Sequence, residues 1–124
     1  MRYKGEKGKL WKLFSEYIRR SSGGVCYTCG VQKDWRELDA GHYEDAGNCG
    51  LYLLFDERNV HAQCTYCNRF KHGNKTNYAL ALTEDYGKNI LKQLKQDRQK
   101  ITKDFPYQEK IAEYQQKLHE IETL

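Results

Sequence analysis

Apolar residues near the start of the chain recur at the spacing of an amphipathic helix. They fall at positions 10, 13, 14, 17 and 18, with charged and polar residues between them. This spacing predicts a helix from about Lys9 to Arg20. Two serines and two glycines follow, which is a stop signal. We expect Trp11 and Phe14 of this helix to pack in the core rather than to stack on a nucleic acid.

The second half of the chain carries a long helical pattern from Asn77 to about Lys103. Gly87 lies inside it, so a division into two helices is an open alternative. The apolar positions that we expect to be buried in this stretch are Leu80, Ile90, Leu94 and Ile101.

A last helix is predicted from Tyr107 to Glu122, after the only proline of the chain. Its apolar residues at 107, 111, 114, 118 and 121 alternate steps of four and three, a period of 3.5. Such a stripe needs a partner surface. The partner is either the rest of the domain or the same stripe of a second chain.

The middle of the chain has shorter patterns. Two strands are predicted, at Leu38 to Tyr43 and at Leu51 to Phe55. The residues between positions 45 and 50 include two glycines and an asparagine, which is typical of a turn. We therefore predict a hairpin. A short helix is expected after it, ending near His72. Strands and helices together predict a small α+β fold.

Two CxxC pairs enclose the predicted hairpin. They are separated by 34 residues, and both thiolates of each pair can reach one ion, so four sulfurs are available for a tetrahedral zinc site. The ligands are Cys26, Cys29, Cys64 and Cys67. Four thiolates leave no position open for water, so this zinc is expected to be structural. The fifth cysteine, Cys49, is expected to be a free thiol.

Charge is unevenly distributed along the chain. The net charge is +4, but residues 1–20 carry +5, residues 21–87 carry −3, residues 88–104 carry +4 and residues 105–124 carry −2. Two basic segments around an acidic centre suit a protein that binds phosphates near a metal site; ordinary solvated helix faces are the alternative. No export signal or membrane-spanning apolar run is evident, so a cytoplasmic protein without a membrane partner is expected.

The residues between the cysteine pairs have the layout of an HNH nuclease. A histidine ends the first predicted strand, an asparagine follows, and the second CxxC runs directly into another asparagine. In such a site His42 would be the general base, Asn59 would orient it, and a side chain on the following helix would bind a divalent metal. The expected core is therefore of the treble-clef, ββα-metal kind, stabilised by zinc.

A closer resemblance rests on the segments KLWKLFSEYIRR, CYTCG, DAGHYEDAG and LLFDERNVHAQCTYCNRFKHGN. The chain resembles the NinG/Rap family of phage recombination endonucleases from about Lys9 to Gly87. The resemblance implies a structure-specific endonuclease that uses Mg²⁺ or Mn²⁺ to cut branched DNA such as Holliday junctions and D-loops. It also implies zinc binding by the four cysteines and active-site roles for His42, Asn59 and Asn68.

One position departs from the general HNH pattern. Many such enzymes have a metal ligand directly before the general base, but this chain has Gly41 there. Residues two apart in a strand share a face, so Asp39 is a candidate substitute, and His61 and His72 are others. With so few protein ligands, we expect the catalytic metal to bind weakly in the absence of DNA.

The expected organisation is a nuclease domain over residues 1–87 and a helical extension over residues 88–124, which binds DNA, a second subunit or the domain itself. Symmetric cutting of a four-way junction needs two active sites, so a homodimer is expected. Less selective nicking of duplex DNA and a DNA-binding module without catalysis are the alternatives. The basic residues expected to contact DNA are Arg58, Arg69, Lys71, Lys75, Lys92, Lys95 and Arg98.

Overall fold

The computed structural model describes residues 3–123. Its first helix, α1 (Gly5–Ser21), is slightly longer than the sequence pattern predicted, and it buries Leu10, Phe14 and Ile18 on one face. A loop then carries the first cysteine pair to a short 3-10 turn, η1 (Trp35–Glu37). The strand β1 (Leu38–His42) follows directly and confirms the first predicted strand.

The sheet has two antiparallel strands, β1 and β2 (Val60–Cys64). In their register Asp39 lies opposite Gln63 and Gly41 lies opposite His61, so these four residues share one face. The predicted partner strand at Leu51–Phe55 was wrong. Residues 50–54 form the helix α2 (Gly50–Leu54) within the long connection between the strands.

The physical reason for this error is the shortness of the apolar run. Five consecutive apolar residues fit a buried strand and a buried helix equally well. Gly50 begins the helix with a φ of +79°, a conformation that other residues rarely adopt. Leu53, Leu54 and Phe55 then enter the core together.

A π-helical turn, η2 (Tyr66–Phe70), follows β2 and contains the last cysteine of the second pair. The long helical stretch beyond it is divided into α3 (Lys75–Tyr86) and α4 (Ile90–Asp97), separated at Gly87. Two of the positions expected to be buried, Ile90 and Leu94, are buried. The other two predictions were wrong, because Leu80 and Ile101 are 65% and 82% exposed.

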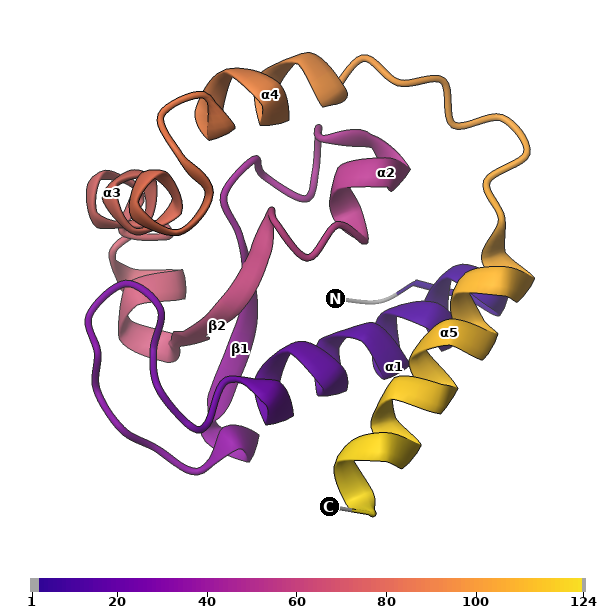
Figure 1. Cartoon of the computed structure of the whole chain (residues 1–124), viewed down its shortest axis with the longest axis horizontal. Helices are drawn as coiled ribbons and strands as arrows, with labels where there is room; N and C mark the ends of the chain where they lie inside the picture. The colour runs from indigo at the N-terminus through magenta and orange to yellow at the C-terminus, as the bar shows by residue number, and fades with distance from the viewer. Residues whose placement is uncertain (1–2, 124) are drawn as a thin grey trace.

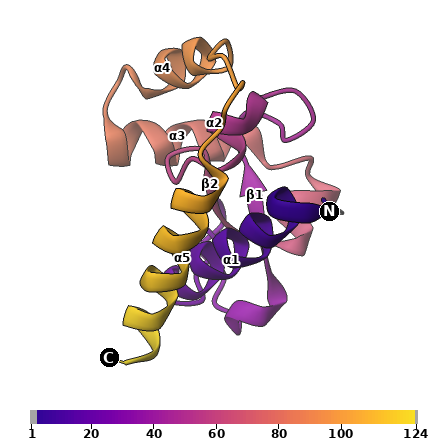
Figure 2. The ribbon, with the colours of Figure 1, turned by 90° about the vertical axis from the view of Figure 1, so that its right-hand side faces the viewer.

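The last helix, α5 (Tyr107–Glu122), has the predicted bounds. It lies against α1 in both views of the ribbon (Figures 1 and 2). Its buried residues are Ile111, Tyr114 and Leu118, and the Tyr114 ring packs edge-on against Phe14 at 5.0 Å. The apolar stripe of α5 therefore packs on its own domain and is covered by α1. A homodimer stays a prediction without an assigned surface.

One hydrophobic core joins the start and the end of the chain. Leu10 and Phe14 of α1 belong to the same cluster as Leu94 of α4 and Ile111 of α5. Residues 88–124, predicted as an extension, thus contribute side chains to the same core as residues 1–87. No helix within residues 3–123 is long and apolar enough to cross a membrane.

Two leucines of α3 provide a matched test of this packing. Leu82 is fully buried, whereas Leu80 on the same helix is 65% exposed. We expect Leu82→Ala to lower the free energy of unfolding by about 2–5 kcal/mol, because it opens a cavity in the core. Leu80→Ala should change it by less than about 0.5 kcal/mol. Urea denaturation of both variants measures the difference, and equal losses would contradict the described placement of α3.

Candidate functional site

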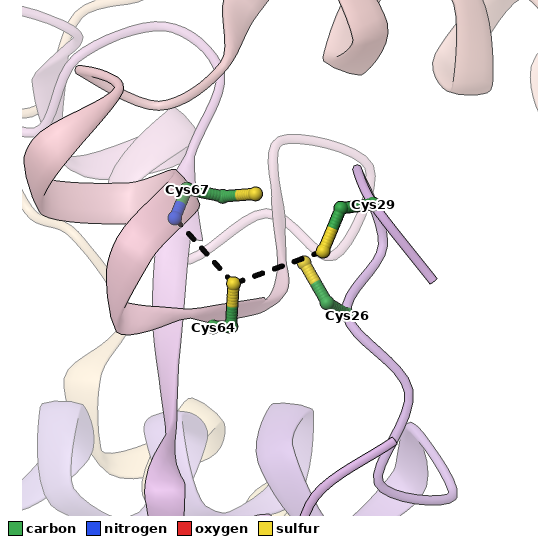
Figure 3. Close-up of side chains that lie close together, drawn as sticks. All are labelled: Cys26, Cys29, Cys64 and Cys67. Carbon is green, nitrogen blue, oxygen red and sulfur yellow. Dashed lines mark hydrogen bonds between the residues drawn. The ribbon is translucent and has the colours of Figure 1, made fainter. Parts of the chain in front are cut away.

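The four cysteines of the two CxxC pairs come together in space. Their sulfur atoms all lie within 4.8 Å of one another, and the side chains converge from three segments (Figure 3). The sulfurs of Cys29 and Cys64 are 3.8 Å apart. Four sulfurs placed about 2.3 Å from an ion in a tetrahedron are separated by about 3.8 Å, so the cluster fits a structural zinc ion.

Neighbouring N–H groups support thiolates in this cluster. The backbone N–H of Cys67 donates to the Cys64 sulfur at 3.4 Å, and the Asn74 amide donates to the Cys67 sulfur at 3.6 Å. An ion held here connects the loop after α1, the end of β2 and the turn η2. Cys49 lies outside the cluster, buried at the start of α2, where its thiol donates to the carbonyl of Gly50.

We expect Cys67→Ser to lose the bound zinc and to lower the free energy of unfolding by several kcal/mol, because metal binding and folding are coupled. The matched control is Cys49→Ser, which changes a buried cysteine outside the cluster and should keep one zinc per chain. Metal analysis and thermal unfolding of the two variants measure this. Retention of zinc by Cys67→Ser would contradict the four-thiolate site.

His42, at the end of β1, is buried and held on two sides. Its ring stacks on Trp11 of α1, with ring centres 5.3 Å apart and planes 20° from parallel. Its Nε2 lies 3.1 Å from the carbonyl oxygen of Leu54. Because a carbonyl only accepts, Nε2 carries the hydrogen and Nδ1 keeps its lone pair. No group within residues 3–123 forms a hydrogen bond with Nδ1.

His42 faces a cavity of about 380 Å³ between β1, the loop after it and the end of η2. Burial disfavours the charged ring and lowers the pKa of His42 to about 4. The ring is therefore neutral at pH 7, with a free acceptor nitrogen. The residues that line this cavity are Ala40, His42, Asp45, Ala46, Asn68, His72, Gly73 and Lys75.

A second cavity, of about 490 Å³, adjoins the first, since Ala40 and Asn68 line both. It holds Asp39, whose carboxylate accepts a hydrogen bond from the Asn68 amide at 3.0 Å and pairs with Arg69 at 3.2 Å. The structure thus brings His42, Asn68 and Asp39 to one continuous polar surface. Arg19 and Arg36 also border the second cavity.

No hydrogen bond joins Asn59 to His42 within residues 3–123, so the predicted orienting role would be indirect. Its side chain is fully buried and bonds only to backbone: Oδ1 accepts from the N–H of Glu44 at 2.7 Å, and Nδ2 donates to the carbonyls of Glu44 and Leu53, both at 3.1 Å. Asn59 fixes the loop and α2, and the next carbonyl, that of Leu54, then holds the His42 ring. It is a positioning residue.

His61 is placed outside the two cavities. Its Nδ1 lies 3.2 Å from the hydroxyl of Tyr78, its Nε2 lies 3.3 Å from the hydroxyl of Tyr86, and its ring stacks on Tyr27 at 3.9 Å. Both ring nitrogens have partners, so the structure does not bring His61 to Asn68 as a metal ligand. Burial lowers its pKa to about 4.

The basic residues predicted to contact DNA have different surroundings. Arg58 is engaged by Asp56 and Asp97, at 2.6 and 2.7 Å, so it stabilises the connection between α2 and α4. Lys75 pairs with Asp45 at the rim of the His42 cavity. The Arg69 side chain is 67% exposed beside Asp39. The other predicted residues lie exposed on the surface: Lys71, Lys92, Lys95 and Arg98.

Sequence reasoning missed two residues of this region. Trp11 was expected in the core, and its contact with His42 depends on how α1 crosses β1. Gln63 had no signal of its own. Only the strand register, which places it opposite Asp39 on the face of Gly41, shows that it borders the site.

The low pKa of His42 and of His61 can be measured directly. Because burial depresses both, the neutral rings should persist as the pH is lowered from 8 to 5, well below the ordinary histidine value of about 6.5. Ring resonances followed by NMR during a pH titration test this. Protonation of either ring near pH 6.5 would contradict the buried environments described here.

The fold and the site define a small α+β protein in which four cysteines that could hold a metal ion lie next to a polar cavity. The chain matches the family described as Bacteriophage Lambda NinG protein over residues 3–123 and belongs to this family. It is 36% identical to protein ninG of Salmonella phage P22 and 33% identical to protein ninG of Escherichia phage lambda, over 97 residues in each case. The resemblance to the NinG family seen in the sequence is thereby confirmed.

Each of these two alignments covers 77% of this chain and 47% of the relative. The chain therefore spans about half the length of the curated relatives that it matches. No solved structure matches it.

Proposed function

We propose that this chain is a zinc-stabilised DNA endonuclease that depends on a second, divalent metal and acts on branched DNA. The proposal rests on one observation: His42 and Asn68 line the same cavity, next to the four-cysteine cluster. These residues come from β1 and η2, and the cluster fixes η2 against the sheet. The arrangement supplies a neutral base and oxygen ligands in a space open to a phosphodiester.

His42 is the residue placed to take a proton from water. Its Nε2–H is held by Leu54, so Nδ1 is the accepting atom, and the stacked Trp11 fixes the plane of the ring. A base with a pKa of about 4 is weak in the free protein. A phosphodiester in the cavity adds negative charge, which raises this pKa toward the range that general base catalysis needs.

Asn68 would hold the divalent metal through its amide oxygen, while its amide nitrogen donates to the Asp39 carboxylate; amide oxygens are ligands that Mg²⁺ and Mn²⁺ accept, and the carboxylate adds negative charge beside them. When bound, the metal neutralises charge on the scissile phosphate and the leaving oxygen. Arg69 is exposed beside Asp39, and Arg19 and Arg36 border the same cavity, so the surface also offers fixed positive charge for phosphates.

Branched DNA as the substrate, and a homodimer as the active form, rest on the family resemblance and on the need for two cuts at a four-way junction. A less selective nickase would use the same residues on duplex DNA. One observation favours a binding module without catalysis: Gly41 offers no side chain to a metal, and Asp39 is already paired with Arg69. Catalytic activity therefore decides between these readings.

The base is tested by His42→Ala. We expect it to reduce cleavage of a four-way junction in Mg²⁺ or Mn²⁺ by about 10²–10⁴-fold, because proton removal is lost, while affinity for the junction stays unchanged. His119→Ala, an exposed histidine on α5, is the matched control and should cleave like the unmodified protein. Equal cleavage by the His42 variant would overturn the assignment.

The substrate class is tested by the unmodified protein alone. Its cleavage of a four-way junction is compared with that of linear duplex of the same sequence, at one salt concentration. Preferential cutting of the junction supports the proposal, and equal cutting supports the nickase. Binding to the junction without cleavage of either DNA would establish the binding module.

A further inference from the structure

Gln63 has a side-chain oxygen without a hydrogen-bond partner. The residue is fully buried on β2, and its Oε1 is the one buried side-chain nitrogen or oxygen within residues 3–123 that lacks a partner. An unsatisfied buried acceptor costs about 1–3 kcal/mol. A native structure keeps such an atom for a reason, such as an ion, a water or a functional role.

The orientation of this amide is fixed by its nitrogen. Nε2 donates to the carbonyl of Gly73 at 2.8 Å and to the hydroxyl of Thr28 at 3.1 Å. Rotating the amide by half a turn would set Oε1 against the Gly73 carbonyl, and two acceptors repel each other. Oε1 must therefore face the opposite direction, toward β1.

The oxygen occupies the space that a side chain at position 41 would need. A Cβ built on Gly41 would lie 1.9 Å from Oε1 of Gln63 and 3.0 Å from Oδ1 of Asn68. Only glycine permits this approach. Since both oxygens lie so close to one point, they are no more than about 5 Å apart.

The Asn68 amide is also fixed with its oxygen toward this point. Its Nδ2 donates to the Asp39 carboxylate at 3.0 Å, which can only accept, so Oδ1 is turned to the other side. Two amide oxygens thus converge beside Gly41, and no donor among the described residues binds either of them. Converging negative dipoles of this kind are stabilised by a cation.

We propose that Gln63 Oε1 and Asn68 Oδ1 are two ligands of the divalent metal, and that Gln63 supplies from β2 the ligand that Gly41 cannot. The proposal rests on the proposed function for the role of that metal, but not for its binding. Both ligands are neutral, so the ion keeps several waters and binds weakly until a phosphate joins it. Asp39 accepts a hydrogen bond from the Asn68 amide nitrogen, so its carboxylate orients this ligand and adds negative charge near the metal without binding it.

The first measurement uses the unmodified, zinc-loaded protein and Mn²⁺ as a paramagnetic probe, without DNA. In nitrogen-15 NMR spectra we expect small additions of Mn²⁺ to broaden the side-chain NH₂ signals of Gln63 and Asn68 and the backbone signal of Gly41. The Gln93 side chain on α4 serves as the remote reference. If Gln63 stays sharp while other signals broaden, or if nothing broadens, Oε1 has another partner, such as a buried water, and the proposal fails.

The second measurement moves the ligand from one strand to the other. Gln63→Ala should weaken Mn²⁺ binding about tenfold or more. The double variant Gly41→Asp with Gln63→Ala should restore the binding, because the new carboxylate enters the space that the glutamine side chain leaves. Gln93→Ala is the matched control. A merely structural role for Gln63 predicts no restoration, and unchanged Mn²⁺ affinity in folded Gln63→Ala overturns the proposal.

Zinc content and thermal unfolding show which variants are folded, and the NMR result on the unmodified protein does not depend on them. The two proposals fail separately. Mn²⁺ bound at Gln63 without any DNA cleavage would leave the metal site standing and refute the endonuclease. DNA cleavage together with an Mn²⁺ affinity that Gln63→Ala does not change would support the endonuclease and refute the metal site at Gln63.

Discussion

The four-cysteine cluster is the constraint on which the rest of the site depends. Its sulfurs, within 4.8 Å of one another, join a loop, the end of a strand and a π-helical turn that have little other hydrophobic packing in common. Cys67 sits in η2 next to Asn68, so fixing the sulfur also fixes the amide beside the cavity. An ion held by four thiolates would have no open position, so in the proposed function it stabilises the structure and the chemistry falls to the neighbouring oxygen and nitrogen groups.

A chain of buried polar contacts connects this cluster to the cavity. The Cys26 sulfur contacts the Thr28 hydroxyl at 3.5 Å, that hydroxyl accepts from the Gln63 amide, and the oxygen of the same amide reaches Gly41. Such networks specify one arrangement because each unpaired member is costly. The loop of the first cysteine pair therefore helps to determine how Gln63 presents its oxygen, so an ion held by the cysteines would indirectly influence the proposed second metal.

The parts of this structure that the sequence predicted are those with a local signature. Cysteine spacing identified the cluster, and the 3.5-residue period identified α5 with its bounds. The predictions that were wrong concern features that tertiary contacts determine. Leu51–Phe55 was too short to separate helix from strand, and the exposure of Leu80 depends on how α3 lies on the core. The contacts of Asn59 and Gln63 became visible only when the loop and the strand register were known.

In the proposed function the four-cysteine cluster positions the site without taking part in the reaction. Replacing zinc by Cd²⁺, which thiolates also bind, tests this role most directly in Mg²⁺-dependent cleavage of a four-way junction. A structural ion predicts that the folded Cd²⁺ form cleaves at a rate similar to that of the zinc form and still requires added Mg²⁺. Loss of cleavage in a folded Cd²⁺ protein, or cleavage by the zinc form without Mg²⁺ or Mn²⁺, would contradict the account.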